Sequence, residues 1–214
     1  DQILPAFKDM KSLKLNAKTL AEVELSRPPT IHQLLVHTAG FSSSFNAGLV
    51  PREMVKKRLS FGPKTGGLEG VVDKLADLPL VFQPGTRWEY GVGIDVAGRV
   101  IEVLSGQSLE NYFHAHIFDP LGMGDTSFIV PGDRLHRFAD LYAAMDTHDF
   151  STDSSADSGG IQRVERAERS HYRHTETFSG GTGLVGTIDD YMLFAEAMRC
   201  RGQGKRGSIL APRT

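Results

Sequence analysis

Helical periodicity is the sequence feature that most constrains the fold of this chain. It recurs along the sequence, whereas the sequence has no long series of segments with the alternating pattern of strands. Apolar residues spaced three and four apart predict helices over residues 94–104 and 109–118, and Thr187 is placed to cap another that runs to Arg201. Shorter stretches of the same kind predict helices at residues 31–38, 51–59 and 68–78. The chain is therefore expected to be helix-dominated, with too few strands for a complete central sheet.

Composition narrows the classes of protein to which the chain can belong. Its 214 residues can bury a sizeable core, and the formal net charge of −2 gives no strong field that would attract nucleic acid. Cys200 is the single cysteine, so no internal disulfide can form, which fits a reducing compartment such as the cytoplasm. No apolar run reaches the length that spans a membrane, so no membrane span is predicted.

One tyrosine stands at the entrance to the helix predicted over residues 94–104. Tyr90 is the penultimate residue of the segment FQPGTRWEYG, in which Pro84 and Gly85 form a turn pair. Loop residues that are held rigidly between such elements often carry chemistry. Taken alone, however, the segment favours a structural interpretation, in which Tyr90 caps a packing cluster with Trp88.

Four sequence blocks, taken together and in order, resemble the serine β-lactamase-like family. They are LLVHTAG (34–40), FQPGTRWEYG (82–91), IFDPLGMGDTSF (117–128) and GGTGLVGTIDD (180–190). This family includes class C β-lactamases, D-alanyl carboxypeptidases, esterases and transesterases. The esterase and transesterase branch is the more similar, because Val92 stands where the lactamase branch usually has asparagine.

The resemblance implies an α+β, β-lactamase/transpeptidase-like fold that is represented mainly by its helical subdomain. In that family the helical subdomain packs beside a five-stranded sheet built largely from the two chain ends. The family's nucleophile is the serine of Ser-x-x-Lys, yet no serine in this chain has a lysine three residues later. We therefore expect residues 1–214 to be a partial domain, truncated at both ends, without the nucleophile segment and the C-terminal strands.

By the same resemblance, Tyr90 is the tyrosine that assists the base beside the nucleophilic serine. Phe178, Gly180 and Gly181 are expected to border the pocket that binds the acyl group. The parent protein is then a serine hydrolase or acyltransferase that acts on small-molecule esters or amides through an acyl-enzyme, and the 214-residue chain alone is expected to be inactive. The alternative is a non-catalytic relative, a helical module that binds a partner through its open face.

Two further motifs are set aside. Lys64-Thr65-Gly66 spells a lactamase triplet, but it precedes Tyr90, whereas the family's triplet follows the tyrosine on a strand. Gly181-x-Gly183-x-x-Gly186 matches a dinucleotide fingerprint but lacks the apolar strand that should precede it. We interpret the latter as a glycine loop that enters the last helix and lets backbone approach backbone.

Metal, cofactor and nucleic-acid sites are not predicted. No third ligand clusters with the paired histidines, so no metal site is assigned, and no other cofactor is expected. The basic stretch 163–173 has no accompanying aromatic platform and is expected to be a solvated excursion rather than a nucleic-acid site. Residues 151–160 are of low complexity and are expected to form a mobile loop.

Overall fold

Helices dominate the structure, a computed structural model that describes residues 3–144 and 161–211. The α-helices are α1 (Ile31–Leu35), α2 (Leu49–Lys56), α3 (Gly67–Ala76), α4 (Gly93–Ser105), α5 (Leu109–Phe113), α6 (Asp119–Leu121) and α7 (Ile188–Arg199). The 3₁₀-helices are η1 (Pro5–Phe7), η3 (Gly132–Arg137), η4 (Ala167–Arg169) and η5 (His171–Arg173), and η2 (His114–Phe118) is a π-helical turn. The strands form two separate antiparallel pairs, β1 (Lys11–Leu13) with β2 (Val23–Leu25) and β3 (Leu141–Ala144) with β4 (Ile161–Glu165). The prediction of a helix-dominated chain is confirmed for the described residues.

Capping side chains start three of the predicted helices where the sequence places them. Before α1, Thr30 Oγ1 accepts the Gln33 backbone N–H at 3.2 Å, and Gln33 Oε1 accepts the Thr30 N–H at 2.9 Å. This reciprocal pair is a capping box. Ser108 and Thr187 cap α5 and α7, each accepting a backbone N–H from three residues ahead at 3.2 Å. A cap of this kind typically contributes about 1 kcal/mol to helix stability.

The helix that starts at α5 continues past residue 118, where the predicted helix ends, and includes Pro120. The π turn of η2 follows α5, and α6 includes Pro120 before the chain turns at Gly122 with φ of 78°. Proline is tolerated in the first turn of a helix, and Pro120 is the second residue of α6. The helix then ends in a Schellman motif, in which Met123 N donates to Phe118 O at 2.8 Å and Gly122 N donates to Asp119 O at 3.2 Å.

Residues 1–29 and 163–173, for which no strand is predicted from the sequence, contain paired strands. The entry segment, residues 1–29, includes β1 and β2, and β1 also bonds to Leu80, whose N–H donates to Lys11 O at 2.8 Å. The stretch 163–173 is mostly exposed, as a solvated excursion would be, but it begins in β4 and buries Ala167 and Ser170. The Asp140 carboxylate organises it, since it accepts both the Ala167 N–H at 2.8 Å and the Arg163 guanidinium at 2.9 Å. The predicted mobile loop at 151–160 lies outside the described residues.

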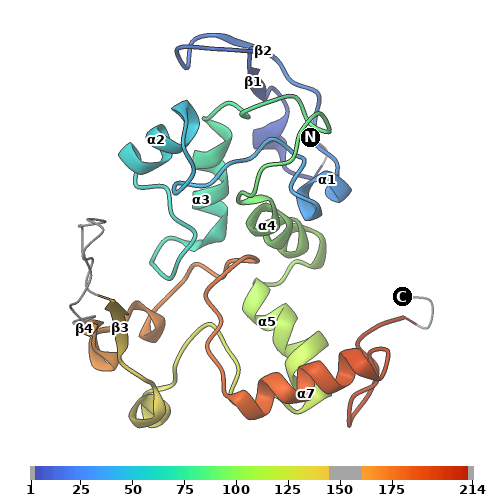
Figure 1. Cartoon of the computed structure of the whole chain (residues 1–214). Helices are drawn as coiled ribbons and strands as arrows, with labels where there is room; N and C mark the ends of the chain where they lie inside the picture. The colour runs from blue at the N-terminus through green and yellow to red at the C-terminus, as the bar shows by residue number, and fades with distance from the viewer. Residues whose placement is uncertain (1–2, 145–160, 212–214) are drawn as a thin grey trace, which may run out of the picture.

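Two hydrophobic clusters divide the chain at the turn between α4 and α5. The first lies among α1, α2, α3 and α4, and its most buried members include Met54, Val72, Leu80 and Val96. The second joins the α5–α6 region to α7 through Phe118, Leu121, Met123 and Ala197. Figure 1 shows the corresponding halves, with α1 to α4 gathered at one end of the molecule and α5 and α7 crossing at the other.

A glycine-rich loop, residues 180–186, packs its backbone directly on α4. A Cβ atom at Gly180 would lie 2.4 Å from the Ile94 carbonyl oxygen, and one at Gly98 would lie 3.0 Å from Gly180 N. Side chains at these positions would therefore separate the loop from the helix. This is the close backbone approach predicted for the glycine loop, and it brings a segment from late in the sequence against the start of α4.

The substitution Gly180→Ala is expected to lower the free energy of unfolding by about 1–3 kcal/mol, because the added methyl group would overlap the Ile94 carbonyl. The matched control is Gly124→Ala, where a Cβ would meet no atom within 4 Å. The control should change stability by less than about 0.5 kcal/mol. Urea denaturation of both variants measures the difference, and equal stability losses would contradict the close packing.

Candidate active site

The backbone around Tyr90 is fixed from two directions. The Tyr90 carbonyl oxygen accepts a hydrogen bond from Asn46 Nδ2 at 2.8 Å. The next N–H, that of Gly91, donates to His37 Nδ1 at 3.4 Å. A Cβ at Gly91 would lie 2.3 Å from the Phe41 carbonyl oxygen, so the chain can pass here because this residue is glycine. The segment that precedes α4 therefore holds Tyr90 in a defined position.

The Tyr90 ring lies between two other rings and remains half exposed. Its centroid is 4.7 Å from that of His37 and 5.8 Å from that of Phe45, and 50% of the residue is accessible to solvent. Trp88 is 66% exposed and presents an edge to His37 at 6.2 Å. The interpretation of Trp88 as a packing residue is therefore wrong, and Tyr90 does not cap a buried cluster.

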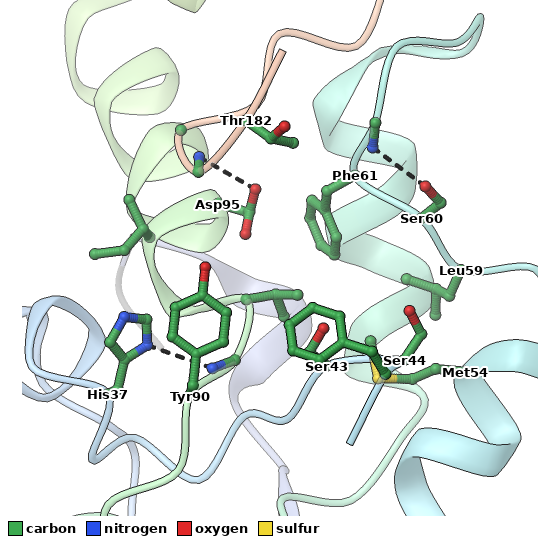
Figure 2. A pocket seen from close by; sticks show the side chains of 17 residues that line it. His37, Ser43, Ser44, Met54, Leu59, Ser60, Phe61, Tyr90, Asp95 and Thr182 are labelled. Atoms are coloured by element: carbon green, nitrogen blue, oxygen red, sulfur yellow. Dashed lines mark hydrogen bonds between the residues drawn. The ribbon is translucent and has the colours of Figure 1, made fainter. Parts of the chain in front are cut away.

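Tyr90 faces a cleft of about 490 Å³, which is formed by segments far apart in the sequence. The first turn of α4 contributes Ile94 and Asp95, and residues 180–182 form a second wall. The segment 59–62, with Met54 of α2, forms a mainly apolar third wall. Figure 2 shows the Tyr90 hydroxyl pointing into this space toward Asp95, with the aromatic ring beside His37.

Asp95 is a buried carboxylate in the cleft wall, with 7% of the residue exposed. It accepts hydrogen bonds from the Ser179 hydroxyl and, at 3.2 Å, from the Gly181 backbone N–H. Burial raises the pKa of the Asp95 carboxyl above its ordinary value, and these hydrogen bonds oppose that rise. Asp95 thus joins α4 to the loop that forms the opposite wall.

The structure brings three of the four predicted site residues together. Tyr90, Gly180 and Gly181 all line the cleft. Phe178 does not line it, and its ring packs instead on Phe128 with centroids 5.4 Å apart. Its position gives no support to the prediction that Phe178 contacts substrate, because the ring belongs to the packing beneath the loop.

Sequence reasoning missed Asp95 as a member of the site. A signal existed, because a carboxylate in the first turn of an apolar helix, one turn before Gly98, marks a polar position on a face that must be buried. It also missed Phe45 and Phe61, which line the cleft. Those two come from an irregular segment whose path the sequence did not reveal.

The Lys64-Thr65-Gly66 triplet has a structural role outside the cleft lining. The Lys64 carbonyl oxygen accepts the Glu176 N–H at 2.8 Å and the Thr177 N–H at 3.1 Å. The Gly66 N–H in turn donates to Glu176 Oε2 at 2.8 Å. These bonds tie the loop before α3 to the segment that leads into residues 180–182. Burial lowers the pKa of the Lys64 ammonium.

Residues 3–144 and 161–211 include neither a cluster of metal ligands nor a helix that could span a membrane. Within those ranges no three histidine, cysteine or acidic side chains come together as metal ligands. None of the helices that the structure describes combines the length and the apolar character needed to cross a bilayer.

The candidate site is a half-exposed tyrosine at a helix entrance that faces a cleft walled by a glycine loop. The family model described as Beta-lactamase matches residues 17–214, so the chain belongs to that family. The fold is β-lactamase/transpeptidase-like and is represented mainly by its helical subdomain, as the sequence predicted.

Curated relatives of this chain are named as esterases and acyltransferases. It is 31% identical over 183 residues to Esterase EstB of Burkholderia gladioli, covering 79% of this chain and 44% of that protein. It is 30% identical over 188 residues to monacolin J acid methylbutanoyltransferase of Aspergillus terreus, covering 86% of this chain and 40% of that protein. A lovastatin esterase of Penicillium rubens is 36% identical over 118 residues, 54% of this chain and 29% of that enzyme.

Solved structures show the same fold. Simvastatin synthase (LovD) of Aspergillus terreus superposes with a TM-score of 0.72 at 28% identity, covering 100% of this chain and 48% of that one. EstCE1, a hydrolase with promiscuous acyltransferase activity, shares the fold with a TM-score of 0.67 at 24% identity, covering 97% and 52%. The chain therefore spans about half the length of these solved structures and less than half of the curated relatives.

Proposed function

We propose that this chain supplies Tyr90 and part of the acyl-binding cleft to a serine hydrolase or acyltransferase. The observation that carries the proposal is the placement of the phenol, which is half exposed and lines a cleft of about 490 Å³. Membership of the family and the esterase and acyltransferase relatives support the same reaction class.

In the proposed reaction Tyr90 acts as a proton acceptor for a serine hydroxyl. A serine hydroxyl is a poor nucleophile at neutral pH and needs a base within hydrogen-bond reach. As the serine oxygen attacks the acyl carbonyl, its proton passes to Tyr90, and a neighbouring ammonium group would favour the phenolate form of the tyrosine. The proton then passes to the leaving alcohol or amine as the bond to the acyl carbon breaks. Water or a second alcohol removes the acyl group from the serine in the reverse sequence.

The nucleophile of this reaction is assigned to a Ser-x-x-Lys segment outside the 214 residues, because the sequence contains none. The cleft walls favour an ester with an apolar acyl group, since Met54, Leu59 and Phe61 lie along one side of the cleft. The exposure of Tyr90 into that cleft favours a catalytic role over the alternative of a partner-binding module.

The 214-residue chain, purified alone, is expected to give no turnover of a chromogenic ester, because it holds one of at least three required catalytic groups. The product of the complete reading frame that contains the chain is expected to hydrolyse the same ester. Steady-state release of the chromophore by the two proteins, at matched concentrations, checks both statements. Turnover by the 214-residue chain that Tyr90→Phe abolishes would refute its predicted inactivity, and an inactive complete protein would favour the non-catalytic alternative.

A further inference from the structure

Asp95 connects two walls of the cleft, the first turn of α4 and residues 179–182, through hydrogen bonds. Its carboxylate projects from the first turn of α4 and accepts the Ser179 hydroxyl and the Gly181 N–H. The Gly181 N–H also lies 3.4 Å from Ser179 Oγ, so the three groups form one local network. Figure 2 shows the Asp95 carboxylate bonded to the loop opposite the Tyr90 hydroxyl.

Glycine packing makes the position of this loop sensitive to small displacements. Gly180 lies so close to α4 that a Cβ there would be 2.4 Å from the Ile94 carbonyl oxygen, while a Cβ at Gly181 would be 2.9 Å from the Asp95 carboxylate. Backbone–backbone contacts of this kind exclude water and fix the distance between the loop and α4, but they supply no hydrogen bond between the two. Asp95 supplies that directional contact.

Burying the Asp95 carboxylate costs free energy, and the packing of the loop on α4 does not by itself require a charged group at this position. A buried acid is unfavourable unless hydrogen bonds or opposite charges compensate it. Here the compensation comes first from Ser179 and Gly181, and His37 contributes as a cationic neighbour when it is protonated. An apolar side chain of similar size would fill the same space without this cost. The carboxylate therefore has a function that its hydrogen bonds to the loop identify.

We propose that Asp95 is a positioning residue, which holds residues 179–182 against α4 and so sets the width of the acyl-binding cleft opposite Tyr90. The effect on turnover rests on the proposed acyl-transfer function, whereas the effect on the loop does not. Asparagine keeps an oxygen that can accept both hydrogen bonds, so Asp95→Asn is expected to retain the loop position. Alanine removes the acceptor, so Asp95→Ala is expected to release the loop.

Hydrogen–deuterium exchange of the peptide that contains residues 179–182 tests the loop directly, in the product of the complete reading frame. In Asp95→Ala its exchange is expected to be about tenfold faster or more, the effect of losing a hydrogen bond to a charged group. In Asp95→Asn the exchange should stay within about threefold of that of the wild-type protein. The control is Asp189→Ala, which removes an exposed carboxylate from the first turn of α7 and should leave this peptide unchanged.

Ester turnover by the same variants tests the consequence for the cleft. In Asp95→Ala, kcat/KM for an ester with an apolar acyl group should fall about tenfold, mainly through a higher KM, because the change removes binding in the ground state and transition state alike. Asp95→Asn should restore most of this loss. Equal exchange in the wild-type protein and Asp95→Ala, or an asparagine variant as impaired as the alanine variant, would overturn the proposal. If the wild-type protein turns over no ester, the proposed function fails, and the exchange result still decides the role of Asp95.

Discussion

Replacing Tyr90 by phenylalanine in the product of the complete reading frame is expected to lower kcat/KM for an acyl ester by about 10²–10⁴-fold, the usual contribution of a general base. The loss should appear mainly in kcat, because the hydroxyl acts on the serine proton and the ring remains to line the cleft. The two rings that flank Tyr90, those of His37 and Phe45, do not depend on its hydroxyl. The fold should therefore tolerate the change, and steady-state kinetics measures the catalytic effect alone.

Tyr191→Phe is the matched control for this prediction. Tyr191 is also exposed, at 65%, but it lies on α7 and does not line the cleft. Its hydroxyl is expected to be dispensable, with kcat/KM within about twofold of the wild-type value. Equal activity of the Tyr90→Phe and wild-type proteins would remove Tyr90 from the mechanism.

Replacing Phe128 by alanine is expected to lower the free energy of unfolding by about 3–5 kcal/mol. Phe128 is 0% exposed and packs against Phe113 and Phe178, with ring centroids 5.9 and 5.4 Å away. It thus connects α5 to the segment that leads into the glycine loop. The cavity left by alanine would be too deep for the neighbouring rings to fill. For a chain of this size the loss corresponds to a decrease in Tm of roughly 6–20 °C.

Leu15→Ala serves as the control for the loss of a large apolar side chain. Leu15 is 79% exposed, so this substitution should change stability by less than about 0.5 kcal/mol. Calorimetry or thermal denaturation of the two variants gives the comparison. A Phe128→Ala protein as stable as the Leu15→Ala protein would show that this ring is not part of a packed core.

The helices were predicted well because a local sequence signal is sufficient to start a helix without help from distant residues. The capping residues Thr30, Ser108 and Thr187 compete for nearby backbone N–H groups whatever the rest of the chain does. The prediction failed where a distant partner decides the outcome. The strand β1 pairs with β2 across the loop between them, and it also bonds to Leu80, which lies far along the sequence. The continuation through Pro120 depends on a π turn that no residue type specifies.

The candidate site was likewise predicted where local residues or the family resemblance defined it, and missed where the path of the chain decided it. The turn and helix around Tyr90 alone favoured a packing role for the ring, and only the family resemblance predicted a catalytic one. The structure places the ring half exposed at a cleft. Gly180 was expected beside the pocket by family resemblance, and it lines the cleft because glycine alone can approach α4 so closely. Phe178, two residues earlier, turns to the opposite side and packs on Phe128. The direction of a loop side chain depends on backbone angles that the sequence pattern does not define.

The central claim is that the Tyr90 phenol serves an activated serine hydroxyl. The most direct measurement is the rate of fluorophosphonate labelling of the complete protein, with mass spectrometry of its peptides, in the wild-type and Tyr90→Phe forms. The account predicts rapid labelling of one serine in a Ser-x-x-Lys segment and at least about a hundredfold slower labelling in the variant. Labelling at equal rates in both proteins, or no labelled serine in the wild-type protein, would contradict it.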